Sequence, residues 1–303
     1  MKKISGGVTA PAGYKAAGMH VGLKKVKPDL ALLVSEKPAA AAAMYTTNLA
    51  KAAPLIVTEE HLAKGGTLRA VVINSANANA CTGEQGIADA VQMTALVAEE
   101  IGCQKEEVAV ASTGVIGVNL PMDKLAAGIK NIVPLLGEDS ETAAKAIMTT
   151  DTFPKEVAAE FQIDDKTVRL GGMAKGSGMV HPNMATMLAF ITTDALISAP
   201  ALQAALSSSV DKSFNMISVD GDTSTNDSVL AIANGMSGCP EIMPDTPEFE
   251  AFAAALDAVC VELAKMVVRD GEGASKLIEI NVNGAKSDQD ACLVAKAIAT
   301  SNL

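Results

Sequence analysis

The 303-residue sequence is poor in aromatic side chains and in positive charge. Aromatic residues make up 3% of it, Trp is absent, and Tyr occurs only at Tyr14 and Tyr45. With so few rings, a platform on which nucleic-acid bases stack is not expected. Lys and Arg number 24 against 35 Asp and Glu, which gives a net charge of -11. This balance disfavours binding to nucleic acid or to anionic membranes.

Histidine and paired cysteines are also scarce. The histidines are His20, His61 and His181, and the five cysteines are widely spaced and never form a CxxC pair. We therefore expect no metal site, and reduced thiols in a cytoplasmic protein. No apolar run approaches the roughly 18 residues of a membrane span, and no apolar stretch follows the two N-terminal lysines. Neither a membrane span nor a signal peptide is expected.

Apolar β-type runs alternate with helical patterns along the chain, which predicts an α/β or α+β fold. The predicted strands are Leu30–Val34, Leu68–Ile73, Val108–Ala111, Thr167–Leu170, Met187–Ile191, Ser228–Ala233 and Leu277–Val282. The predicted helices are Ile87–Ile101, one capped by Asp123 through Ile132, Ala143–Met148 capped by Ser140, one from Ser198 through Val210, Pro247–Arg269 capped by Thr246, and Asp288–Ala299.

The segment Gly171–Thr193 is rich in glycine and contains Lys175, His181 and Thr186. Glycines allow tight turns and close approach to a ligand, and Thr186 is placed at the opening of an apolar strand. The Walker A and GxGxxG patterns of phosphate binding are both absent. A glycine-rich surface turn that leads into a buried strand is the simpler interpretation of this segment alone.

Two further turns have polar groups that suit chemistry. Ser112–Gly114 follows an apolar strand, so backbone N–H groups at Thr113 and Gly114 could form an oxyanion hole, although such turns are common. Glu272 lies between two glycines and suits recognition of a cation, although a solvated turn explains it equally well. Thr150 follows a predicted helix, where its hydroxyl is equally explained by a C-terminal turn.

A third segment, Ser218–Asp227, contains Asp220, Asp222 and Asp227, which at first suggests a calcium loop. An EF-hand loop needs Gly at its sixth position and Glu at its twelfth, and this sequence has neither there. A capped loop with internal hydrogen bonds is therefore the expected structure.

Six segments in the same order resemble the ornithine acetyltransferase family, also called glutamate N-acetyltransferase, of arginine biosynthesis. They are SANANACTG at Ser75–Gly83, STGVIG at Ser112–Gly117, TTDTFPK at Thr149–Lys155, KGSGMVHPNMATMLAFITTDA at Lys175–Ala195, SVDGDTSTND at Ser218–Asp227 and RDGEGASK at Arg269–Lys276. They cover nearly the whole chain, and the long match around Thr186 is highly specific.

The resemblance implies that the precursor cleaves itself between Ala185 and Thr186. An α chain of residues 1–185 and a β chain of residues 186–303 would then build one domain together. A threonine hydroxyl is a weak nucleophile, but the freed α-amine, with a reference pKa of roughly 7.7–8.0, can act as its base. Lys175 nearby would lower the pKa of that amine and favour its basic form.

The resemblance also implies a ping-pong reaction. Thr186 takes acetyl from N-acetylornithine and passes it to glutamate, with Thr113 and Gly114 as the oxyanion hole. Thr150, Lys175, Thr186 and Glu272 correspond to substrate-binding positions. No metal or cofactor is implied. Some family members also use acetyl-CoA as donor, and the sequence leaves that second activity open.

The family fold is an αββα sandwich that resembles the N-terminal-nucleophile hydrolases, and its processed chains assemble as an α₂β₂ tetramer. Family members continue past the equivalent of Ala299–Leu303, so the chain is expected to lack a C-terminal segment. Two alternatives stay open. One is a self-processing amidohydrolase or aminopeptidase that uses the same N-terminal threonine with water as acceptor. The other is a non-enzymatic binding module.

Overall fold

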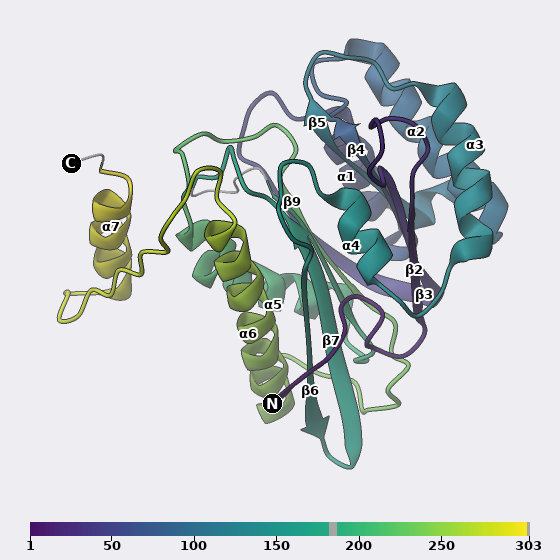
Figure 1. The fold of residues 1–303 in the computed structure, drawn as a ribbon. Helices are drawn as coiled ribbons and strands as arrows, with labels where there is room; N and C mark the ends of the chain where they lie inside the picture. Colours follow the sequence, from purple (N-terminus) through teal and green to yellow (C-terminus); the bar gives the residue numbers. More distant parts are fainter. Residues whose placement is uncertain (182–186, 302–303) are drawn as a thin grey trace.

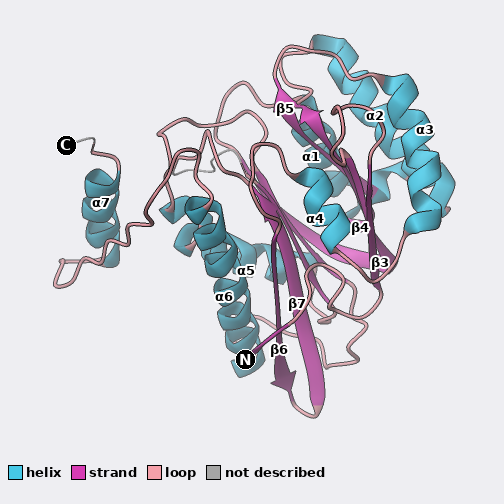
Figure 2. Cartoon of the chain, in the orientation of Figure 1, coloured by secondary structure: helices cyan, strands magenta, loops and turns pink. Residues whose placement is uncertain are grey.

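A computed structural model describes residues 1–181 and 187–301 and has one connected sheet of nine strands (Figures 1 and 2). The strand order is β1-β6-β7-β8-β9-β3-β4-β5, with β2 paired to β3. The strands are β1 (Lys2–Ile4), β2 (Tyr14–Met19), β3 (Leu30–Tyr45), β4 (Thr67–Asn77), β5 (Val108–Val115), β6 (Lys155–Ile163), β7 (Lys166–Lys175), β8 (Leu188–Thr193) and β9 (Ser228–Ala233).

The helices cover the two outer sides of this sheet, with α5 and α6 on one side and α1, α2 and α3 on the other (Figure 1). They are α1 (Ala53–Gly65), α2 (Gly83–Ile101), α3 (Met122–Ile132), α4 (Glu141–Ile147), α5 (Ala199–Lys212), α6 (Pro247–Arg269) and α7 (Asp288–Ala299). Short 3₁₀ turns are η1 (Lys105–Glu107), η2 (Val133–Leu135) and η3 (Phe214–Met216).

Strand β3 joins two halves of the sheet that pack face to face. Its first part pairs with β2 and β4, and Ala40–Tyr45 pairs with β9. Because side chains alternate along a strand, Val71 faces the core between the halves, whereas Val72 faces α1, α2 and α3. Phe190 and Ile191 divide in the same way between the inner core and the core under α5 and α6. The three cores define the αββα sandwich that the sequence predicts.

Most elements agree with the predicted ones, but two predicted caps are wrong. Helix α3 has Pro121 at its N-cap rather than Asp123, and no side chain caps it. Ser140 lies at the N-cap of α4, yet its hydroxyl donates to Glu156 instead of accepting a helix N–H. The predicted cap of α6 is confirmed, because Phe249 N donates to Thr246 Oγ1 at 3.2 Å.

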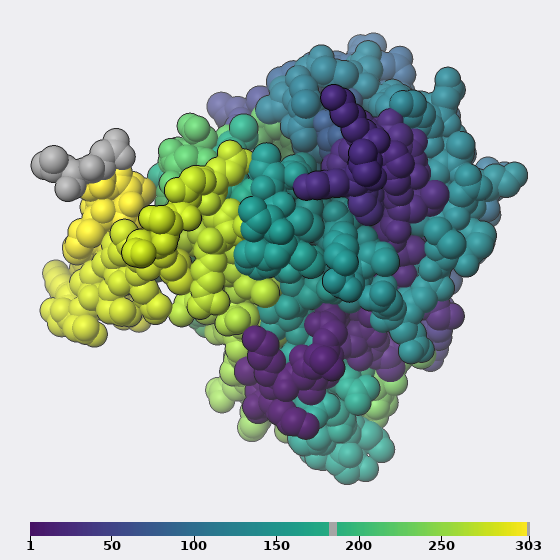
Figure 3. Space-filling model, in the orientation of Figure 1, coloured from purple at the N-terminus to yellow at the C-terminus, as the bar shows by residue number. Residues whose placement is uncertain are grey.

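The strand predicted at Leu277–Val282 is wrong, because this stretch is irregular and largely exposed. It connects α6 to α7, which has no buried residue and stands apart from the two helical layers (Figures 1 and 3). Elements β1, β2, β6 and α1 were not predicted. Over the described part of the chain, no helix is both long and apolar enough to cross a membrane.

Candidate functional site

The end of β5 forms a tight turn beside the end of β4. Residues Ser112–Gly114 pair with Asn74–Ala76 in parallel register. Gly114 has a φ of 133°, and a Cβ there would lie 2.2 Å from the carbonyl carbon of Ala76. Ala76 itself has a φ of 96°, which is costly for a residue with a side chain. Glycine is therefore required at position 114, and backbone strain is concentrated at the predicted oxyanion turn.

Lys175, the last residue of β7, reaches this turn from the other half of the sheet. Its Nζ lies 3.5 Å from Thr113 Oγ1, and its side chain is almost fully buried. Burial lowers the pKa of Lys175, while the nearby carboxylate of Asp151 opposes that shift. The structure thus joins two predicted site residues, Thr113 and Lys175, that are far apart in the sequence.

Ser177 connects the other two predicted substrate-binding residues. Its hydroxyl is hydrogen-bonded to Thr150 Oγ1 at 2.7 Å, and its carbonyl accepts from Glu272 N at 2.6 Å. A Cβ added at Gly178 would lie 2.7 Å from Glu272 Oε1, so the Glu272 carboxylate lies against this loop. Thr150 and Glu272 are exposed, whereas Lys175 is buried. A polar surface for a small substrate is therefore present above a buried cation.

Beneath these residues lies a buried ionic cluster that the sequence did not reveal. Lys155 Nζ donates to Asp151 Oδ1 and Asp270 Oδ2, both at 2.6 Å, and its side chain is fully buried. Asp151 Oδ1 also accepts from Gly176 N at 2.7 Å, and Asp270 Oδ2 accepts from Thr152 N at 2.9 Å. The cluster ties together the loops that contain Thr150, Lys175 and Glu272.

The charges of this cluster stabilise one another. Burial alone would raise the pKa of Asp151, but the charges of Lys175 and Lys155 and the hydrogen bonds to this carboxylate hold it below its usual value. Lys155 and Asp270 both lie within segments that match the family, TTDTFPK and RDGEGASK. Neither residue has a role predicted from the sequence, and nothing in the sequence pairs residues that are 115 positions apart.

The predicted nucleophile Thr186 and its predecessor Ala185 lie outside the described residues. Met187 follows directly, and its backbone N–H donates to Asp227 Oδ1 at 2.9 Å. The loop that precedes Asp227 has internal hydrogen bonds as the sequence predicts, because Asp222 N donates to Asp220 Oδ1 at 3.2 Å and Asn226 N donates to Ser224 Oγ at 3.1 Å. Within the described ranges, no group of three or more His, Cys, Asp or Glu side chains could hold a metal ion.

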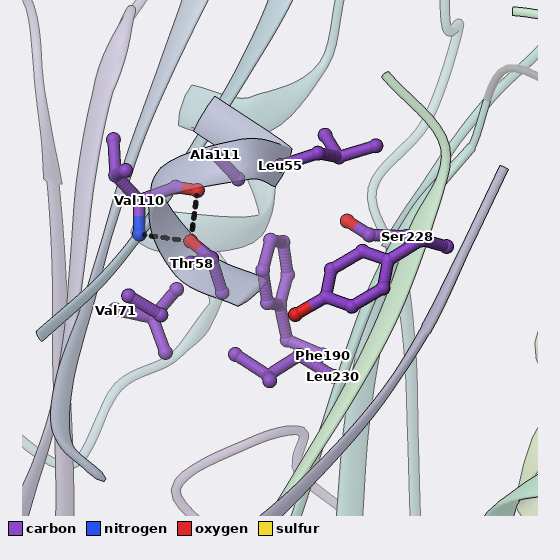
Figure 4. A pocket seen from close by; sticks show the side chains of 10 residues that line it. Leu55, Thr58, Val71, Val110, Ala111, Phe190, Ser228 and Leu230 are labelled. Atoms are coloured by element: carbon purple, nitrogen blue, oxygen red, sulfur yellow. Dashed lines mark hydrogen bonds between the residues drawn. The ribbon is translucent and has the colours of Figure 1, made fainter. Parts of the chain in front are cut away.

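A small, mostly apolar cavity lies between α1 and the strands near the site (Figure 4). Beside it, Thr58 Oγ1 accepts from Val110 N and donates to Val110 O, both at 2.9 Å. The cavity is lined by Tyr45, Leu55, Thr58, Val71, Ala109, Val110, Ala111, Phe190, Ser228 and Leu230. Its apolar lining suits packing rather than binding of a charged amino acid.

The layers define a class of mixed α/β folds with the layering of N-terminal-nucleophile hydrolases. A solved l-aminopeptidase d-ala-esterase/amidase from Ochrobactrum anthropi, a variant of the ntn hydrolase fold, is similar to this chain with a TM-score of 0.53. The two are 13% identical, and the match covers 88% of each chain. At that identity the likeness shows the fold alone.

The chain belongs to the ArgJ family, whose model matches residues 15–303. It is 57% identical to the arginine biosynthesis bifunctional protein ArgJ of Symbiobacterium thermophilum, over all of this chain and 76% of that protein. The ornithine acetyltransferase of Mycobacterium tuberculosis, solved in complex with ornithine, is 46% identical with a TM-score of 0.55. That match covers 58% of this chain and 95% of the solved chain.

Proposed function

We propose that this ornithine acetyltransferase of arginine biosynthesis moves acetyl from N-acetylornithine to glutamate through an acetyl ester on Thr186. Thr186 Oγ attacks the acetyl carbonyl carbon, and its proton passes through the α-amine of Thr186 to the departing nitrogen of ornithine. The C–N bond breaks and ornithine leaves. The α-amine of glutamate then attacks the ester, which forms N-acetylglutamate and restores the threonine hydroxyl.

The observation that carries this proposal is the contact between Lys175 and Thr113. It puts a buried cation 3.5 Å from the residue expected to supply an oxyanion donor. Preorganised donors at such a turn stabilise the negative charge of a tetrahedral intermediate. Glu272 and Thr150 lie around Ser177 next to this point and are proposed to bind the amine and polar groups of the amino-acid substrate.

We also propose that self-cleavage before Thr186 produces the α chain 1–185 and the β chain 186–303. The α chain would hold about 61% of the 303 residues. The solved Mycobacterium chain, nearly all of which is matched, covers 58% of this chain. This agreement in length supports a separate α chain. We further propose an α₂β₂ assembly in the cytoplasm, and the five free cysteines support a reducing compartment.

Intact mass spectrometry and an acetyl-transfer assay test these proposals together. We expect two masses with a break before Thr186, and a single uncut chain for Thr186→Ala. N-acetylglutamate should form from N-acetylornithine and glutamate faster than free acetate does. If acetate dominates, the enzyme is an amidohydrolase rather than a transferase. The relatives are named as bifunctional proteins, so acetyl transfer from acetyl-CoA to glutamate is the second activity to assay.

A further inference from the structure

Asn226 links two backbone carbonyls at the predicted oxyanion turn. Its side-chain Nδ2 donates to Ser112 O at 2.9 Å and to Ala78 O at 2.6 Å, and the residue is buried. Thr225 Oγ1 donates to Asn226 Oδ1 at 2.6 Å, which fixes the orientation of the amide. A peptide unit is planar, so holding the Ser112 carbonyl also fixes the direction of the Thr113 N–H. Asn226 therefore fixes the orientation of the Thr113 N–H, a predicted oxyanion donor.

Asp227, the next residue, is bonded to the backbone directly after the predicted nucleophile. Its Oδ1 accepts from Met187 N at 2.9 Å, and Met187 is joined directly to the predicted nucleophile. A backbone hydrogen bond joins the same two segments, because Ser228 N donates to Met187 O at 3.2 Å. Asp227 is fully buried. It therefore fixes the first described backbone group after Thr186.

The second carboxyl oxygen of Asp227, Oδ2, is buried without a hydrogen-bond partner among the described residues. Burial raises the pKa of Asp227 to about 8, although hydrogen bonding from the Met187 N–H and from Ser224 and the charge of Lys175 act against this shift. Burial therefore favours the neutral, protonated form of this side chain. The carbonyl oxygen of a protonated carboxyl still accepts a hydrogen bond from a backbone N–H. A carboxyl that already carries its proton is a poor general base.

We infer that Asn226 and Asp227 are positioning residues that together align the oxyanion turn with the strand that begins just after the nucleophile. Because the two residues are adjacent in the chain, Ser112 and Met187 are held by one dipeptide directly before β9. A misplacement of about 1 Å between reacting groups can reduce a rate on the order of 10²-fold. This inference rests on the proposed function, because it assigns Thr186 as the nucleophile and Thr113 as an oxyanion donor.

The opposite ends of β8 and β9 offer matched controls. There Asp194 accepts from Arg169 N at 2.8 Å and from Ala12 N at 3.0 Å, and Asn234 Nδ2 donates to Ala12 O at 2.9 Å. Both residues are buried, like Asn226 and Asp227. They make comparable bonds to the backbone but hold none of the site residues. Their loss should affect folding without affecting alignment of the site.

The test uses three variants of the pair, Asn226→Ala, Asp227→Ala and Asp227→Asn. Two controls, Asp194→Ala and Asn234→Ala, are measured beside them. For each protein we compare kcat, KM, the extent of self-cleavage and the Tm. Rates are divided by the amount of cleaved protein found by intact mass. We expect the first two variants to lose on the order of 10²-fold in kcat with little change in KM, and to cleave slowly. Asp227→Asn retains an oxygen acceptor for Met187 N and should stay within a few-fold of wild type. The two controls should lower Tm but leave kcat unchanged.

Several results would overturn the inference. Wild-type kcat and complete cleavage in both Asn226→Ala and Asp227→Ala would show that alignment does not depend on them. An equal loss in Asp227→Asn and Asp227→Ala would assign Asp227 to proton transfer instead. If Asp227→Ala does not fold, the smaller change Asp227→Ser removes the same acceptor from Met187 N. A wild-type protein that neither cleaves nor transfers acetyl would overturn the proposed function, and this inference with it.

Discussion

Asp227 is a single carboxyl whose protonation couples the site to stability. An aspartate in an unfolded chain releases its proton at a pKa of about 3.9, whereas burial raises the pKa of Asp227 in the folded protein to about 8. Between these values the folded state binds the additional proton. Rising pH therefore favours the unfolded chain, with a slope of up to about 1.4 kcal/mol per pH unit from this group.

We predict that Asp227→Asn removes this part of the pH dependence. The free energy of unfolding of the aspartate protein should fall relative to that of the asparagine variant as pH rises from 5 to 8. Urea unfolding of both proteins in the Thr186→Ala background, where the chain is expected to stay uncut, measures this difference. Asp222→Asn, at an exposed aspartate in the same loop, is the control and should show no such trend. Parallel pH profiles for Asp227→Asn and its parent would contradict the assignment.

At the scale of elements, helix α1 protects the open edge of β5. Strand β5 pairs with β4 on one side only, and on its other side Thr58 bonds both the N–H and the carbonyl of Val110. His61 Nδ1 lies 2.9 Å from Val108 O on the same edge. Side chains from a helix thus replace the missing neighbouring strand, which prevents edge-to-edge pairing with another molecule.

Thr58→Val is predicted to destabilise the protein because it keeps the side-chain volume but removes the hydroxyl. Two buried backbone groups of Val110 lose their partner, at about 1–3 kcal/mol for each unsatisfied group. Chemical unfolding monitored by circular dichroism measures the loss. Thr58→Ser retains the hydroxyl and should cost clearly less. Equal stability of the valine variant and wild type would show that this edge needs no cover.

The cluster around Lys155 acts between elements, because it joins the loop before β6, the loop after β7 and the end of α6. Lys155→Met removes the ion-pair partner that the buried carboxylates of Asp151 and Asp270 share, at about 3–5 kcal/mol. Since Thr150, Lys175 and Glu272 lie on these loops, KM for both amino-acid substrates should also rise. Denaturation and steady-state kinetics provide the two measurements.

A surface ion pair provides the comparison for that variant. Lys2 pairs with Glu160 at 3.3 Å with 76% of the lysine side chain exposed, so Lys2→Met should have little measurable effect. If Lys155→Met lowered stability but left every KM unchanged, the cluster would be purely structural. If it changed neither, the two buried ion pairs would contribute nothing detectable.

Local signals explain which elements the sequence could predict. The runs Ala70–Ile73 and Val108–Ala111 are buried on both faces and are continuous apolar stretches, and Thr246 with Pro247 marks the start of α6. Strand β2 (Tyr14–Met19) contains Lys15 and three further residues of low β propensity, so its pairing with β3 decides its structure. Leu277–Val282 has the apolar pattern of a strand but no partner strand in the described chain.

Site residues could be predicted from the sequence only within the segments that match the family. The matches selected Thr113, Lys175, Thr150 and Glu272, and the structure brings them together around Ser177 and the β5 turn. The links that hold them, such as Lys155 to Asp270, join residues far apart in the sequence. Such partners are set by strand order and loop packing, which single-residue patterns do not encode. The placement of Thr186 and of the bond before it stays a prediction.

At the scale of the whole molecule, the proposed β chain is held on both sides by the proposed α chain. In the strand order β7-β8-β9-β3, the two strands from residues 186–303 lie between two strands from residues 1–185. Their inner side chains, including Phe190 and Ile232, share one core with Leu33 and Val71. Cutting the chain before Thr186 removes one covalent link but no strand pairing. The cleaved pieces should therefore remain one folded body.

We predict that both pieces elute together in gel filtration under native conditions and separate only in denaturant. Intact mass spectrometry of the native peak should find the two masses in equal amounts, and uncut Thr186→Ala should elute at the same volume. A peak that contains only one of the pieces would contradict this arrangement, because neither piece can leave without exposing the core that both share. A volume that corresponds to two copies of each piece would support the proposed α₂β₂ assembly. A volume for one copy of each would contradict that assembly and leave the shared sheet intact.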